Sequence, residues 1–142
     1  MIVVIDNFIK DQDLLRDISN DINFFSDPGV YYWWDGWWNG EAKSLKHRLI
    51  EHIWADNCPL SEAIAIRGFE YWTGIQTADP NMGFENNLGG HFDKDEELFE
   101  LTGKIVTPSM GTVYYPEQSE FEGGMLEIYS EGEDKEPEVV YA

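Results

Sequence analysis

The chain has 142 residues, of which 42% are hydrophobic and 15% aromatic, so it can bury a core as one domain without a disulfide framework or a structural metal. Its 28 acidic residues against nine basic ones give a net charge of −19. Such a surface repels phosphate backbones and anionic lipids, which excludes nucleic acids and membranes as main partners. The single cysteine, Cys58, cannot form an internal disulfide, and the N-terminus lacks the features of a signal peptide, so we expect a cytoplasmic protein.

The N-terminal region, residues 1–60, is predicted to be mainly helical. The β-branched run Ile2–Ile5 indicates a short strand, and Asp11 then has the character of a helix N-cap. Apolar residues follow Asp11 at helical spacing, namely Leu14, Leu15, Ile18 and Ile22. Glu41–Ala55 is predicted as a second helix, whose apolar face comprises Leu45, Leu49, Ile50, Ile53 and Trp54.

The segment Tyr31–Trp38 contains six aromatic residues in eight positions. One interpretation is a stacking platform in which Trp33 and Trp34 contact a substrate. The other is packing of large rings in the core, which buries much apolar area. The sequence leaves both interpretations open.

Residues 61–142 are predicted to form strands. Hydrophobicity alternates with a period of two from Ile64 to Trp72, and a polar loop follows at 77–90. Further strands are expected at Lys104–Tyr115, at Met125–Tyr129 and from Val139 onward. Two helices followed by strands alone favour an α+β fold.

The segment Leu88–Asp93 contains the pair of side chains most suggestive of chemistry. Residues i and i+2 of an extended chain point to the same side, so His91 and Asp93 would aim an imidazole nitrogen and a carboxylate at one point. Such a pair, with one more histidine, forms the facial triad of non-haem iron(II) enzymes. Gly89 and Gly90 would let the backbone approach that site closely.

With these residues in view, nearly the whole chain resembles the iron(II)- and 2-oxoglutarate-dependent dioxygenase superfamily, in particular its prolyl-hydroxylase-like branch. Three segments carry the resemblance in the family's order. They are Gly89–Glu96 with its His-x-Asp, Thr112–Pro116, and Phe121–Tyr129 with its Gly-Gly-x-Leu pattern. The strand around Glu70-Tyr71-Trp72 also has its counterpart before the His-x-Asp.

The resemblance implies helices packed on a partial double-stranded β-helix, a jelly-roll or cupin-like barrel. It implies His91 and Asp93 as ligands of Fe(II), with their ligating atoms about 3 Å apart. Tyr114, and less strongly Tyr71, would hydrogen-bond 2-oxoglutarate. The activity implied is hydroxylation of a C–H bond in a small molecule or peptide.

The family's distal histidine and the basic residue that pairs with 2-oxoglutarate are missing. Both follow the Gly-Gly-x-Leu hairpin in the family, and the only basic residue after Lys104 is Lys135 in an acidic loop. We therefore expect a fragment of a longer product, inactive or nearly so by itself. The competing interpretations are a non-catalytic β-barrel module that binds carbohydrate or peptide through the Tyr31–Trp38 cluster, and a cupin-like zinc or manganese protein.

Overall fold

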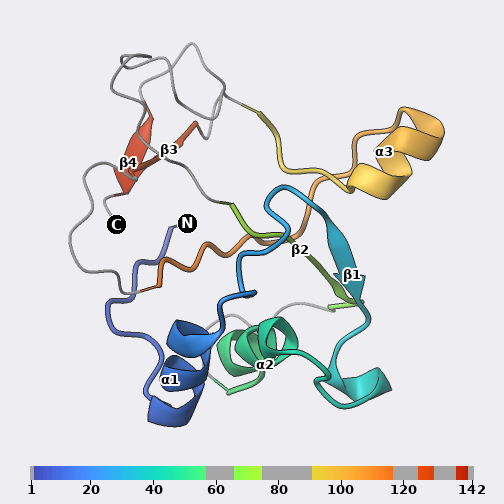
Figure 1. Ribbon diagram of the computed structural model, residues 1–142. Helices are drawn as coiled ribbons and strands as arrows, with labels where there is room; N and C mark the ends of the chain where they lie inside the picture. Colours follow the sequence, from blue (N-terminus) through green and yellow to red (C-terminus); the bar gives the residue numbers. More distant parts are fainter. Residues whose placement is uncertain (1, 57–65, 75–90, 117–124, 130–136, 141–142) are drawn as a thin grey trace.

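The computed structural model describes residues 2–56, 66–74, 91–116, 125–129 and 137–140. These residues form a mixed α+β arrangement of three α-helices and two small antiparallel sheets (Figure 1). In chain order the elements are α1 (Gln12–Asn20), β1 (Tyr32–Trp34), the 3-10 turn η1 (Trp37–Asn39), α2 (Leu45–Glu51), the π-helical turn η2 (His52–Asp56), β2 (Phe69–Tyr71), α3 (Glu96–Thr102), β3 (Leu126–Ile128) and β4 (Glu138–Val140). The α+β prediction is confirmed at this level, while no closed barrel is formed by the described residues.

Helices α1 and α2 lie side by side (Figure 1) and both begin at side-chain caps. The Asp11 carboxylate accepts hydrogen bonds from the backbone N–H groups of Asp13 and Leu14, at 2.9 and 3.0 Å. The Ser44 hydroxyl accepts one from the N–H of His47 at 3.1 Å. These caps satisfy donors that the first helical turn leaves unpaired. The predicted cap at Asp11 is thus confirmed.

Strands β1 and β2 form a two-stranded antiparallel ribbon. Tyr32 lies opposite Tyr71, Trp33 opposite Glu70, and Trp34 opposite Phe69. Because successive side chains of a strand point to opposite faces, the first and third pairs share one face and the middle pair occupies the other. We call the face with Trp34 and Phe69 the inner face, and the face with Trp33 and Glu70 the outer face.

Two clusters of buried side chains make up the core. The first comprises Ile9, Leu14, Ile18, Phe24 and Leu49, and joins α1 to α2. The second comprises Trp34, Trp54 and Phe69, and attaches the inner face of the ribbon to the C-terminal part of the second helix. Ile53 packs against both clusters, so the two are continuous through η2.

Several predicted boundaries are corrected. The first helix ends at Asn20, so Ile22 lies outside it and is 93% exposed rather than packed. The second helix begins at Leu45 instead of Glu41 and continues as a π-helical turn through Asp56. Neither Ile2–Ile5 nor Lys104–Tyr115 forms a strand, since neither is paired in a ladder with any residue that the structure describes.

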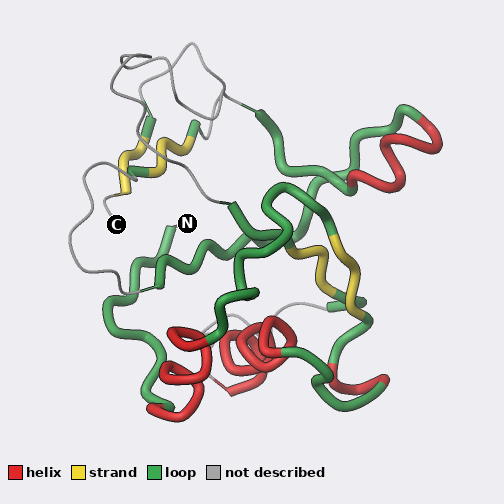
Figure 2. The backbone as a smooth tube through the Cα atoms, viewed as in Figure 1, coloured by secondary structure: helices red, strands yellow, loops and turns green. Residues whose placement is uncertain are grey.

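Helix α3 replaces part of the extended segment expected after Asp93. Its N-cap Asp95 accepts from the N–H of Leu98 at 2.8 Å, and Gly103 ends the helix with a left-handed φ of 68°. A hydrogen bond of 2.9 Å from Asp95 N–H to Val106 O joins the residues that flank the helix on either side. Figure 2 shows α3 projecting from a long irregular stretch of chain.

The C-terminal strands agree with the predictions. β3 and β4 pair antiparallel, with Leu126 opposite Val140 and Ile128 opposite Glu138. The start of the predicted strand at Ile64, the loop at 77–90, and Cys58, Gly89, Gly90, Gly123, Gly124 and Lys135 lie outside the described residues. Among the helices that the structure describes, none has the length and apolar character needed to cross a membrane.

Candidate functional site

His91 and Asp93 approach one another just before α3. The distance from His91 Nε2 to Asp93 Oδ1 is 3.6 Å, and their side chains are 51% and 67% exposed. Two cis ligands of a single ion with bonds of about 2.1 Å lie about 3 Å apart. A closure of roughly half an ångström would therefore bring both atoms to one metal ion.

The chain segment that faces this pair is residues 104–116. A Cβ atom added at Gly111 would lie 3.7 Å from Asp93 Oδ2, so Gly111 is a close neighbour of the carboxylate. The hydrogen bond from Asp95 N–H to Val106 O also joins these two segments. The pair is therefore anchored on one side although its side chains are open to solvent.

A third ligand is not supplied by neighbouring side chains. Within the described ranges, no three His, Cys, Asp or Glu side chains are grouped closely enough to hold one ion. His47 and His52 lie on α2 and η2 and pack against aromatic rings there, Trp34 and Phe8 respectively.

A pocket of about 520 Å³ opens on the outer face of the ribbon, which we call the outer pocket. Its lining combines aromatic rings with carboxylates: Tyr31, Tyr32, Trp33, Glu70, Asp95, Glu96, Glu97 and Glu100. Burial, followed by the charges of Glu96, Glu70 and Asp93, raises the pKa of the Tyr31 phenol. Asp95, which lines this pocket, is two residues from Asp93 in the chain, so the outer pocket lies near the His91–Asp93 pair.

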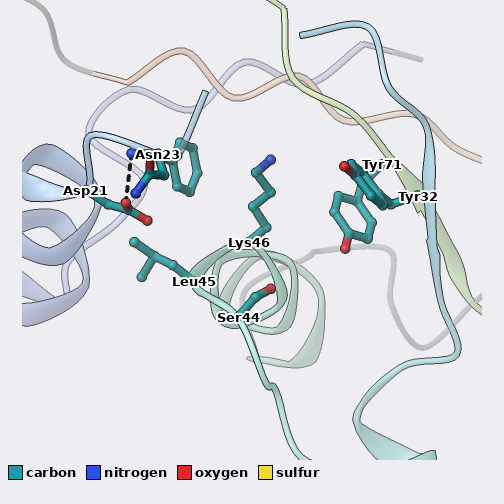
Figure 3. A pocket seen from close by; sticks show the side chains of 8 residues that line it. Asp21, Asn23, Tyr32, Ser44, Leu45, Lys46 and Tyr71 are labelled. Carbon is teal, nitrogen blue, oxygen red and sulfur yellow. Dashed lines mark hydrogen bonds between the residues drawn. The ribbon is translucent and has the colours of Figure 1, made fainter. Parts of the chain in front are cut away.

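A smaller pocket of about 220 Å³, the inner pocket, lies between α2 and the ribbon. Figure 3 shows Lys46 rising from α2 into it, with Asp21 and Asn23 on one side and Tyr32 and Tyr71 on the other. The Lys46 ammonium lies 5.7 Å from the centre of the Tyr32 ring. Tyr32 is a lining residue of both pockets.

Tyr71 is held tightly within the inner face. Its hydroxyl is hydrogen-bonded to His47 Nε2 at 3.0 Å, and its ring stacks on Tyr32 with centroids 5.7 Å apart. The imidazole of His47 in turn stacks on Trp34, with a centroid distance of 4.4 Å and an interplanar angle of 4°. Burial raises the pKa of Tyr71 and lowers that of His47, so both groups are neutral near pH 7.

The other residues predicted for the site are divided between surface and core. Tyr114 packs against the first core cluster, where its ring contributes to packing. Trp33 is 55% exposed on the outer face, and its indole N–H donates to Asp35 Oδ1 at 2.7 Å. Trp34 is only 9% exposed and belongs to the second core cluster. The core interpretation therefore applies to Trp34, whereas Trp33 lies outside the core.

The alternative carbohydrate platform required Trp33, Trp34, Trp37 and Trp38 to form one exposed flat patch. Trp34 is buried, and Trp37 packs against the second core cluster with its ring stacked near Phe69. The four indoles are therefore not coplanar on one surface, and the structure gives no support to a platform of that kind.

Three charged residues that line the two pockets were not predicted as site residues from the sequence. Glu70 entered only as part of a strand motif, and Glu100 and Lys46 were not assigned any role. The alternation of Glu70 and Tyr71 on β2 was a usable signal, since it places them on opposite faces. Comparison of the chain with protein-family models, with curated proteins and with solved structures found no match in any of the three.

Proposed function

We propose that this chain is part of an iron(II)- and 2-oxoglutarate-dependent dioxygenase that hydroxylates a C–H bond of its substrate. The observation that carries the proposal is the 3.6 Å approach of His91 Nε2 to Asp93 Oδ1. An imidazole and a carboxylate in this relation are two thirds of the facial triad. The third ligand would come from outside the described residues.

In this proposal the residues of the chain bind and orient the reactants. His91 and Asp93 would hold iron(II), and Gly111 leaves room for the Asp93 carboxylate to reorient toward it. The iron and 2-oxoglutarate would supply the oxidation, in which O₂ converts R–H and 2-oxoglutarate into R–OH, succinate and CO₂. Trp33 and Tyr31, exposed in the outer pocket, would contact the substrate.

Metal binding tests the proposal directly. Cobalt(II) serves as a stand-in because it prefers similar donors and binds them somewhat more tightly than iron(II). On adding cobalt(II), we expect NMR signals of residues near His91 and Gly111 to broaden or shift first, and His91→Ala and Asp93→Ala to abolish that selectivity. Asp13→Asn removes an equivalent exposed charge on α1 and serves as control. Equal broadening in wild type and His91→Ala would contradict the proposal.

Binding of 2-oxoglutarate needs a cation, because the co-substrate is a dianion and the chain carries −19. Tyr114 and Tyr71 remain the predicted hydrogen-bond donors to it. Of the two, Tyr71 lines the inner pocket together with Lys46, on the face of the ribbon opposite Trp33 and Glu70. We expect Tyr114→Phe to weaken 2-oxoglutarate binding to the iron-loaded chain in calorimetry, and Lys46→Met, which changes only the inner pocket, to leave it unchanged. A loss of binding in Lys46→Met would place the co-substrate in the inner pocket and contradict this arrangement.

Turnover provides the final test. Iron-dependent release of succinate from 2-oxoglutarate is expected of a product that includes the distal histidine and a basic anchor. The 142-residue chain by itself is expected to release little or none. Full turnover by this chain, lost in His91→Ala, would mean that the third ligand lies within it.

A further inference from the structure

The outer pocket has a chemical character that the proposed iron site does not explain. Its described lining consists of three aromatic side chains from β1 and its flank and five carboxylates. Glu70 comes from β2, whereas the other four come from the cap and body of α3. The aromatic rings on and beside β1 and the carboxylates of β2 and α3 therefore line the same pocket.

This lining favours an organic cation over other ligands. The electron-rich faces of Tyr and Trp attract an ammonium or guanidinium group by about 0.5–2 kcal/mol, and carboxylates add Coulomb attraction. An anion would be repelled. A bare metal ion is disfavoured too, because the carboxylates among the described residues are not gathered closely enough to coordinate one.

The protein already holds a cation of its own in this manner beside the pocket. The Lys94 ammonium bonds to Glu96 Oε1 at 2.6 Å and lies 4.7 Å from the centre of the Phe99 ring. The side chains of Lys94 and Glu96 are only 21% and 25% exposed. On this helix, an ammonium group is thus already held between a carboxylate and an aromatic ring.

Unlike Glu96, three of the carboxylates are open to solvent. Glu97 and Glu100 are exposed on α3, and Trp33 presents more than half of its surface. Glu70 is exposed on β2, and partial desolvation raises its pKa, ahead of a lowering contribution from the Glu96 N–H at 3.4 Å. A bound cation would reduce the mutual repulsion of these carboxylates.

We propose that the outer pocket binds an organic cation, an ammonium or guanidinium group, through the rings of Tyr31 and Trp33 and the carboxylates of Glu70, Glu97 and Glu100. Since Asp95 lines the pocket and is two residues from Asp93, this group would be the charged end of the substrate that is hydroxylated. That second statement depends on the proposed function, whereas cation binding itself does not.

The test uses the metal-free chain in the presence of a chelator. Nα-acetyl-lysine amide and Nα-acetyl-arginine amide are titrated by NMR, with Nα-acetyl-norleucine amide as the uncharged control of equal length. We expect the two cations to shift the Trp33 indole N–H and the amides of β1 and α3, and norleucine to bind at least about tenfold more weakly. Equal binding of all three probes would overturn the proposal.

Matched variants locate the binding. Trp33→Leu, and separately the double variant Glu97→Gln with Glu100→Gln, are each expected to weaken lysine-amide binding about tenfold. Glu41→Gln removes an exposed charge from a residue that does not line the pocket, and should have no effect. Equal weakening by Glu41→Gln would mean attraction to the net charge alone, and would overturn the proposal.

A further comparison distinguishes the source of the cation. A five-residue peptide with a central lysine that binds more tightly than the amide indicates a protein substrate, whereas equal affinity indicates a small amine. Cation binding that persists while His91→Ala leaves cobalt(II) binding unchanged would refute the proposed function but not the pocket. Selective cobalt(II) binding that depends on His91, without selective binding of the cationic amides, would refute the cation pocket but not the proposed function.

Discussion

The two faces of the β1–β2 ribbon are composed of similar residues yet have opposite environments. On the inner face Trp34 packs against Phe69 in the second core cluster. The imidazole of His47 contacts the rings of both Trp34 and Tyr71. On the outer face Trp33 and Glu70 border an open pocket rich in carboxylates. Adjacent tryptophans thus differ in role because alternation of a strand sends them to opposite sides.

If the outer pocket binds a ligand as proposed, stability and recognition are separated across a single pair of strands. Replacements on the inner face should lower the free energy of unfolding, whereas replacements on the outer face should change binding.

The largest difference in stability is expected between two single variants, Trp34→Ala and Trp33→Ala. Trp34→Ala should lower the free energy of unfolding by about 3–5 kcal/mol, because it leaves a large cavity among buried rings. Trp33→Ala should cost about 1 kcal/mol or less, since the ring is more than half exposed. Chemical denaturation measures both, with Trp34→Phe as a milder variant. Equal losses in the free energy of unfolding at Trp33 and Trp34 would contradict the difference between the two faces.

A close backbone approach at Gly68 gives the next largest effect. A Cβ atom there would collide with the Trp33 ring and would lie 2.9 Å from the Trp34 carbonyl oxygen. Gly68→Ala should therefore cost about 1–3 kcal/mol by overpacking and displace the Trp33 ring from the outer pocket. Gly40→Ala provides a contrast in which the new methyl group meets no atom but the backbone φ of 158° disfavours it. Denaturation together with the shift of the Trp33 indole N–H reports both consequences.

The hydrogen bond between Tyr71 and His47 predicts a smaller loss. Tyr71→Phe keeps the ring stack but removes the hydroxyl, so the free energy of unfolding should fall by about 0.5–1.5 kcal/mol. Tyr115→Phe on an exposed tyrosine is the matched control. A neutral result for Tyr71→Phe would mean that the bond contributes nothing measurable to the inner face.

The smallest expected effect is a pH dependence from His47. Its pKa is lowered by burial and then by the charge of Lys43, so the folded state favours the neutral imidazole. The unfolded chain therefore binds more protons as the pH falls below 6.5, and stability should decrease there until the folded-state pKa is passed. Above pH 6.5 this contribution is constant. Denaturation of wild type and His47→Phe between pH 5 and 8 should show the slope only in the wild type.

The sequence predicted the elements whose determinants are local. The caps and apolar spacing of the first helix and the core of the second are encoded within a few residues of each other. The strand at Met125–Tyr129 was also found, because alternation and the preceding glycines lie close together. For these elements the physical cause is read directly from adjacent positions.

Other elements depended on contacts that the sequence does not display. Helix α3 buries none of its residues although it contains Leu98, Phe99 and Leu101, and its cap Asp95 and the terminating Gly103 were local signals that the prediction did not use. Lys104–Tyr115 alternates like a strand but has no ladder partner among the described residues. The approach of His91 to Asp93 follows from their spacing, whereas the outer pocket required the ribbon register and the position of α3.

Tyr32 lines both pockets and its ring faces the inner one, which has a thermodynamic consequence. A ligand that turns this ring when it enters one cavity changes the shape offered to a ligand in the other. The two affinities are then linked, and the linkage is reciprocal, so each occupant alters the other's dissociation constant by the same factor. At equilibrium the order in which the two ligands are added would not matter. The Tyr32 side chain alone would couple the binding of a ligand in the inner pocket to the binding of a cation in the outer pocket.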